Sequence, residues 1–122
     1  MIITAYVLAG LIAAGIIYIG INYLLVPEKS AASFGLAEIP TGTTAFFEIK
    51  GGRDIGVGLV LVAAMLAGGH HLVGWVVLAE AIMPVFDMLI ILRHRGSRAA
   101  AFGIHGATAA VMVVISLLFL LG

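Results

Sequence analysis

The chain has 122 residues, of which 63% are hydrophobic and 10% are charged, with six Lys and Arg balanced by six Asp and Glu. Its mean hydropathy is +1.26. A soluble domain carries roughly 25% charged residues, so this composition excludes an ordinary soluble globular protein. The lack of cysteine excludes disulfides, thiolate metal ligands and cysteine nucleophiles. The zero net charge gives no reason to expect nucleic-acid binding.

Hydrophobic residues fall into four blocks long enough to cross a bilayer core of ~30 Å. These expected spans cover residues 2–26, 46–69, 72–92 and 99–121. They leave no room for a second domain. The sequence therefore predicts an all-α integral membrane protein, a four-helix bundle formed by residues 1–122, with the lipid bilayer as its first partner.

The first expected span carries small residues on one face. Ala9, Ala13 and Gly20 are spaced by four and then seven residues, which keeps them on the same side of a helix. Small side chains let a neighbouring transmembrane helix approach closely. We expect this face to pack against another span.

Basic residues predict how the chain lies in the membrane. All six flank two of the expected connections, and none falls at the opposite ends of the spans: Lys29, Lys50, Arg53, Arg93, Arg95 and Arg98. Because cytoplasmic loops carry the excess of Lys and Arg, both connections should be cytoplasmic and both termini extracytoplasmic. The expected location is the plasma or inner membrane.

Charged residues at the start of the second span are drawn below the membrane surface. The apolar run Ile55–Gly69 is too short to span alone, so Arg53 and Asp54 must enter the membrane with it. Counting ~1.5 Å per residue, they lie about 10–12 Å deep, and Asn22, Asp87 and His105 lie about 6–10 Å deep. All four spans thus place a polar group in one layer, which predicts a shared site.

The third expected span contains Glu80, Pro84 and Asp87. The two carboxylates are seven residues apart and share a helix face. Pro84 has no N–H to donate to the carbonyl of Glu80, so a free carbonyl should lie close to a carboxylate near the middle of the membrane. Such interrupted helices occur at membrane sites for ions or polar substrates, but an ordinary proline kink gives the same pattern.

A purely structural role for these charges is the alternative. Arg53 could pair with Asp87 and Lys50 with Asp54, leaving Glu80 protonated, so that the network only fixes the bundle. Ionisable groups inside a membrane are functional by default, which favours a pocket. No metal site and no cofactor are expected.

The connection formed by residues 27–45 allows two interpretations. Its first part can form a short interfacial helix that stops at Gly35, and its second part, from Pro40 to Thr44, has the composition of a turn and helix cap. The segment either covers a cavity from the membrane surface or merely connects two spans. Gly52 and Gly56 form a GxxxG pattern that predicts close helix packing near Arg53.

The motifs resemble those of a family of small four-span bacterial and fungal membrane proteins, defined only as a domain of unknown function. The resemblance covers the whole chain, and its most specific part is a KGxRD-x3-GL pattern. The residues that carry it are Pro27, Ala31, Phe34, Gly35, Leu36, Phe47, Lys50, Gly51, Arg53, Asp54, Gly58 and Leu59. Gly52 departs from the pattern, which usually has a larger apolar residue there. The resemblance implies the fold and topology and leaves the activity open.

Three functions from different classes are compatible with this pattern. The first is binding of a small amphiphilic or lipophilic molecule from the cytoplasmic leaflet, with Arg53 holding an anionic or carbonyl group. The expected ligand-binding residues are Asn22, Lys50, Gly52, Arg53 and Glu80.

The second function is a membrane enzyme, a hydrolase or isomerase, with Asp54, Asp87 and His105 as acid and base groups. Two carboxylates bridged by an arginine would resemble one-step epoxide hydrolases. The third is proton-coupled transport through Glu80 and Asp87, which in so short a chain would require a homo-oligomer. The sequence identifies neither the ligand nor the reaction.

Overall fold

The computed structural model describes residues 1–39 and 41–122, and these residues form helices and no strand. The turn expected at Pro40 therefore lies outside the described residues. The elements are α1 (Ile2–Leu25), α2 (Pro27–Ala32), α3 (Thr44–Ala67), α4 (His70–Glu80), α5 (Ile82–Arg93), α6 (Arg98–Ala100), the π-helix η1 (Ala101–Gly106) and α7 (Ala107–Leu121).

Three helical segments are long and apolar enough to cross a membrane: Ile2–Leu25, His70–Arg93 and Arg98–Leu121, each of 24 residues. The second consists of α4 and α5, and the third of α6, η1 and α7. Helix α3 also has 24 residues, which at ~1.5 Å per residue exceeds a bilayer core. Every 18-residue stretch of α3, however, includes Lys50, Arg53 and Asp54, so it is less apolar than the other three.

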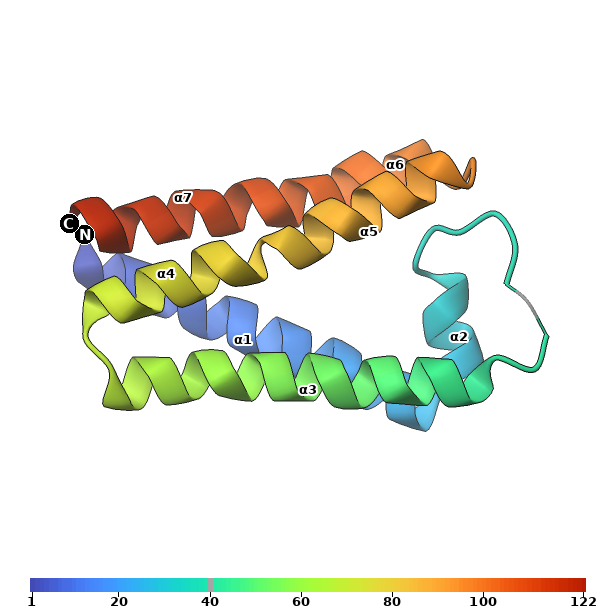
Figure 1. The fold of residues 1–122 in the computed structure, drawn as a ribbon, viewed down its shortest axis with the longest axis horizontal. Helices are drawn as coiled ribbons and strands as arrows, with labels where there is room; N and C mark the ends of the chain where they lie inside the picture. The colour runs from blue at the N-terminus through green and yellow to red at the C-terminus, as the bar shows by residue number, and fades with distance from the viewer. Residues whose placement is uncertain (40) are drawn as a thin grey trace.

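Helix ends differ by one or two residues from the expected spans, which is ordinary fraying of the boundaries. One difference is systematic: α3 begins and ends two residues earlier than expected, and His70 and His71 begin α4 instead of lying in a connection. The two termini and the α3–α4 connection lie at one end of the molecule, which we call the terminal end (Figure 1). The α1–α3 connection, with α2, and the α5–α6 turn lie at the other, the basic end.

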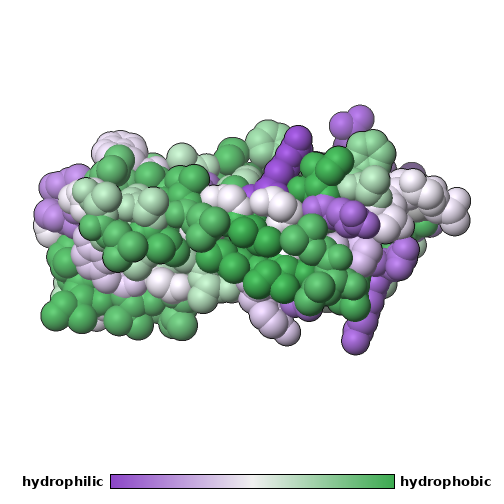
Figure 2. All heavy atoms as spheres, turned by 90° about the horizontal axis from the view of Figure 1, so that it is seen from below, coloured by the Kyte–Doolittle hydropathy of each residue, from purple (hydrophilic) through white to green (hydrophobic). Residues whose placement is uncertain are grey.

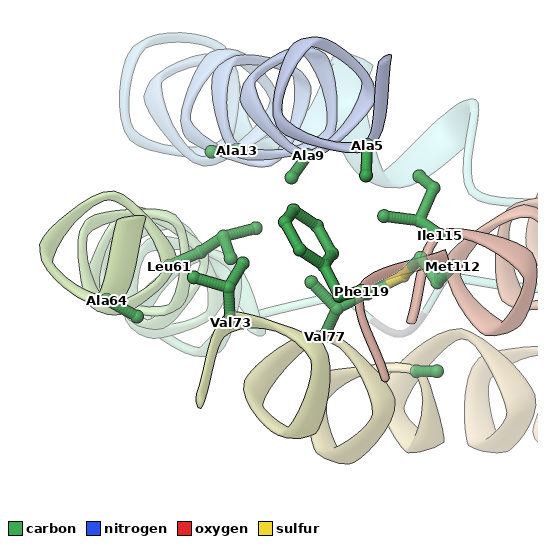
Figure 3. Packing of buried hydrophobic residues seen from close by; sticks show 11 residues of the cluster. Ala5, Ala9, Ala13, Leu61, Ala64, Val73, Val77, Met112, Ile115 and Phe119 are labelled. Carbon is green, nitrogen blue, oxygen red and sulfur yellow. The ribbon is translucent and has the colours of Figure 1, made fainter. Parts of the chain in front are cut away.

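The hydrophobic core fills the half of the molecule nearer the terminal end. Ala5, Ala9 and Ala13 of α1 are buried, and they leave room for the ring of Phe119 from α7 (Figure 3). Tyr6 packs edge-on against this ring, with centroids 4.9 Å apart. The core is completed by Leu61, Ala64, Val73, Val77, Ala81, Met112 and Ile115. The expected packing of the small face of α1 is confirmed.

Helices α1 and α3 stay in close contact toward the basic end because glycines face each other there. A Cβ on Gly51 would lie 2.6 Å from the carbonyl oxygen of Gly20, and one on Gly58 would lie 3.0 Å from that of Ala13. The prediction that Gly52 and Gly56 pack closely is wrong, since both are exposed with nothing within 4 Å of an added Cβ. The glycines seven residues apart, not four, share the packed face.

The outer surface is largely apolar. Large hydrophobic side chains such as Ile3, Leu11, Leu66 and Leu121 are more than 60% exposed. Figure 2 shows this as a mainly hydrophobic face, with hydrophilic residues gathered at one tip and over the part toward the opposite end. Water does not favour such a surface, whereas the hydrocarbon core of a bilayer does.

Candidate functional site

A pocket of about 330 Å³ lies in the half of the molecule nearer the basic end. It forms there because α5 packs mainly on η1 and α7, while α1 packs mainly on α3, so space remains between these two groups of helices. Most lining side chains are apolar, and a few polar groups converge among them. The lining residues are Ile16, Ile19, Tyr23, Ser33, Phe34, Lys50, Asp54, Val57, Glu80, Met83, Pro84, Asp87, Ile104, His105, Thr108 and Met112.

The apolar segment His70–Arg93 is interrupted at the pocket, as its proline predicts. Helix α4 ends at Glu80 and α5 begins at Ile82. Pro84 has no N–H for the carbonyl of Glu80, which explains the break. Glu80 is only 8% exposed, and its Oε2 is buried with no hydrogen-bond partner among the described residues.

Asp87 and His105 face each other across the pocket wall. Asp87 Oδ2 lies 3.7 Å from His105 Nδ1, too far for a direct hydrogen bond but close enough for an ionic interaction. His105 Nε2 lies 2.9 Å from the carbonyl oxygen of Phe34. A carbonyl only accepts, so Nε2 carries a proton, and Nδ1 is the position at which the ring can take up or release one.

His105 belongs to the π-helix η1, a widened turn of a kind frequently found at functional sites. One carbonyl in this stretch, that of Ile104, accepts a hydrogen bond from Thr108 Oγ1 at 2.6 Å. The widened turn lies on the segment that provides both Ile104 and His105 to the pocket.

Lys50 and Asp54 form an ion pair on one face of α3, with Nζ 2.7 Å from Oδ2. The Lys50 ammonium also lies 4.4 Å from the ring centroid of Tyr23 and 5.5 Å from that of Phe34. The faces of aromatic rings attract cations. Lys50 is therefore held between a carboxylate and two rings at the part of the pocket nearest the basic end.

The connection after α2 contributes Ser33 and Phe34 to the pocket, so it does more than join two helices. Gly35 has a φ of +116°, a conformation that favours glycine, and an added Cβ would lie 2.6 Å from Cβ of Ala100. Its carbonyl accepts a hydrogen bond from Ser97 N at 2.8 Å. These contacts hold Phe34 against His105, with ring centroids 4.5 Å apart.

The structure brings five of the eight expected site residues into this pocket: Lys50, Asp54, Glu80, Asp87 and His105. It places the other three elsewhere. Asn22 donates a hydrogen bond from Nδ2 to the carbonyl of Tyr18, one turn earlier, at 3.0 Å. It lines a separate cavity, also of about 330 Å³, together with Lys29. Gly52 is exposed on the outer face of α3.

The expected ion pair between Arg53 and a carboxylate is wrong. Arg53 is exposed, and among residues 1–39 and 41–122 no carboxylate lies within ion-pair distance of it. The reason is helical geometry: Lys50 and Asp54 line the pocket, whereas Arg53 is turned by about 100° from Asp54 around the axis of α3 and lies on its exposed side. The arginine-bridged carboxylates expected for an epoxide hydrolase are therefore not formed by the described residues.

Sequence reasoning missed Tyr23 and did not include Phe34 among the binding residues. Tyr23 is buried and lies four residues after Ile19 and seven after Ile16, so its helical spacing on the pocket-facing side of α1 was a usable signal. Phe34 carried no such signal, because its position depends on how the connection folds back toward Ser97. The described residues contain no group of three or more His, Asp or Glu that could hold a metal ion.

Comparison with known proteins identifies the family. Residues 13–119 match the family described as Domain of unknown function (DUF4267). The chain belongs to this family. No curated protein and no solved structure matches it.

Proposed function

We propose that the chain is an integral membrane bundle of four spans, with α3 as the fourth, and that its basic end faces the cytoplasm. Support comes from the equal 24-residue lengths of the helical segments and from the gathering of the basic loops at one end. The charged positions of α3 that reach the pocket, Lys50 and Asp54, neutralise each other, which lowers the cost of placing this helix in a membrane.

Labelling of single cysteines tests the topology, because the chain has none of its own. Ser97→Cys and Gly122→Cys should react with a membrane-impermeant maleimide from opposite sides of the membrane. Reaction of both from the same side would contradict the four-span arrangement.

We propose further that the protein binds a small amphiphilic or lipophilic molecule in the pocket at its basic end. The observation that carries this proposal is a mostly apolar cavity of about 330 Å³ into which a few polar groups converge. Ligand sites are typically concave, about 300–1,000 Å³, and apolar with a small number of placed polar groups. Arg53 has no part in this proposal, since it lies outside the pocket.

Thermal unfolding of the purified protein in phosphatidylcholine nanodiscs tests the binding proposal, with octylamine, octanol and octanoate as probes. At least one probe should raise the unfolding temperature of the wild type. It should have no such effect on Val57→Trp, in which a bulky ring fills the pocket from α3. The matched control is Leu59→Trp, which points outward from the same helix at 54% exposure. Equal responses of all three proteins would contradict the proposal.

An acid/base membrane enzyme is the second candidate, favoured by one observation, the contact between Asp87 and His105 beside an apolar cavity. His105 Nδ1 would accept a proton from a bound substrate while Asp87 stabilises the resulting imidazolium. Incubation with a membrane-lipid extract followed by mass spectrometry tests it. A product formed by the wild type and absent with His105→Gln would establish turnover. No observation favours transport, since a packed core fills the terminal half.

A further inference from the structure

Glu80 is the polar group that the proposed function leaves unexplained. It lies at the inner end of the pocket, seven residues and thus about 10 Å along the segment from Asp87. The residue is more than nine-tenths buried, and its Oε2 is buried with no hydrogen-bond partner among the described residues. A buried polar atom without a partner is costly, so its presence indicates that something else supplies the partner.

The other carboxylates of the pocket already have partners. Asp54 is paired with Lys50 at 2.7 Å, and Asp87 faces His105 at 3.7 Å. The pair of Lys50 and Asp54 is neutral because the two charges are opposite. The pair of Asp87 and His105 is neutral when the two side chains hold one titratable proton between them. When Glu80 is ionised, its carboxylate therefore adds one uncompensated negative charge to the cavity, at the end away from Lys50.

The space between Glu80 and the basic end is apolar. Ile19, Val57 and Met83 line it from three different helical segments. The cavity of about 330 Å³ suits a ligand with a short hydrocarbon body.

We propose that the pocket binds a small lipophilic amine, whose ammonium group donates to Glu80 and whose hydrocarbon body lies along Ile19, Val57 and Met83. This inference rests on the proposed ligand-binding function and names its ligand class. An ammonium group supplies both the missing donor and the opposite charge, and in an apolar site this interaction is much stronger than in water. A hydroxyl supplies a donor without the charge, and an anion would place a second negative charge beside the first.

Specific binding of radiolabelled octylamine, octanol and octanoate in phosphatidylcholine nanodiscs tests the inference. Specific binding is the difference between the wild type and Val57→Trp, which removes the contribution of partition into the lipid. The wild type should bind octylamine at least tenfold more tightly than octanol, and octanoate least. Glu80→Gln, nearly identical in shape, should lose this preference, and Glu80→Asp, which keeps the charge, should retain part of it.

The control variant is Glu48→Gln, which removes an exposed carboxylate of α3 and should bind octylamine like the wild type. Retained octanol binding by Glu80→Gln shows that its pocket is intact. Octylamine affinity unchanged in Glu80→Gln, or tighter binding of octanol or octanoate than of octylamine, would overturn the amine inference and leave the pocket standing. Absence of specific binding for all three probes would overturn both proposals.

Discussion

The two halves of the molecule are built from the same four helical segments but are packed differently. In the terminal half, Ala5, Ala9 and Ala13 face the ring of Phe119, and the core is filled. In the basic half, α1 and α3 remain in contact through Gly20 and Gly51. Helix α5 packs on η1 instead, and a pocket remains between α1 and α3 on one side and α5 and η1 on the other. Small residues bring helices together, and the position of those residues decides which helices meet.

Backbone irregularities separate the halves. The break between α4 and α5 and the π-helix η1 occur on the two segments that form the far wall of the pocket. Each irregularity lies next to a polar residue of the pocket: the α4–α5 break follows Glu80, and η1 contains His105. The filled half can therefore hold the bundle together while the hollow half presents Glu80, Asp87 and His105 to a cavity. The following predictions test this separation of stability from binding.

The largest expected effect is on the filled half. Phe119→Ala removes a fully buried ring from the core and should lower the free energy of unfolding by about 3–5 kcal/mol, as for other buried aromatic residues. Denaturant unfolding in mixed micelles measures it. Leu121→Ala is the control, because Leu121 is 78% exposed two residues away and should change the stability little. Equal losses in the two variants would show that the terminal half is not the stabilising core.

A smaller effect is expected where α1 meets α3, and two adjacent glycines test it. A Cβ on Gly51 would lie 2.6 Å from a carbonyl oxygen of α1, so Gly51→Ala should destabilise by about 1–3 kcal/mol. Gly52 has nothing within 4 Å of an added Cβ, so Gly52→Ala should be neutral or stabilise the helix by up to about 1 kcal/mol. Comparison of their unfolding midpoints measures the difference, and a reversed order would exclude the described approach of α1 and α3.

In the hollow half, Asp87 should matter more to binding than to folding. Asp87→Asn keeps the shape but leaves His105 and Lys50 without this counter-charge, so the pocket becomes more positive and octylamine should bind at least tenfold more weakly. The stability loss should be on the order of 1 kcal/mol. Thermal unfolding and octylamine binding are measured together for Asp87→Asn and Asp87→Ala. If both variants unfold and the wild type binds no probe, the charged groups serve only structure.

Much of the fold could be predicted because hydrophobic blocks and small-residue spacing are local patterns. The expected spans lie within two residues of the observed helical segments, and the small face of α1 packs as its spacing predicts. Pro84 likewise indicated an interrupted helix, because the missing N–H is a property of one residue. A pairing of two charges four residues apart on one helix is also a local pattern. The pair of Lys50 and Asp54 could therefore be predicted from the sequence.

The rest could not be predicted, because it depends on which helix faces which. Depth along the membrane placed Arg53 in the same layer as Asp87, but depth does not determine rotation about the helix axis. For the same reason, the sequence predicted close helix packing at Gly52 and Gly56, whereas the glycines that pack against α1 are Gly51 and Gly58. Phe34 reaches His105 only because its connection folds back toward Ser97, a contact that joins segments far apart in the sequence.

The smallest effect should come from substitution of Arg53. Comparison with substitution of Lys50 tests the outer face of α3 against its pocket-facing side. Arg53 is exposed and outside the pocket, so Arg53→Gln should change the stability by less than about 0.5 kcal/mol and octylamine affinity by less than twofold. Lys50→Gln, three residues earlier, leaves Asp54 without its partner at 2.7 Å and should cost about 1–3 kcal/mol. Unfolding and binding measured side by side distinguish the two faces. A change in octylamine affinity in Arg53→Gln as large as that in Lys50→Gln would place the arginine at the site and contradict the orientation of α3 described above.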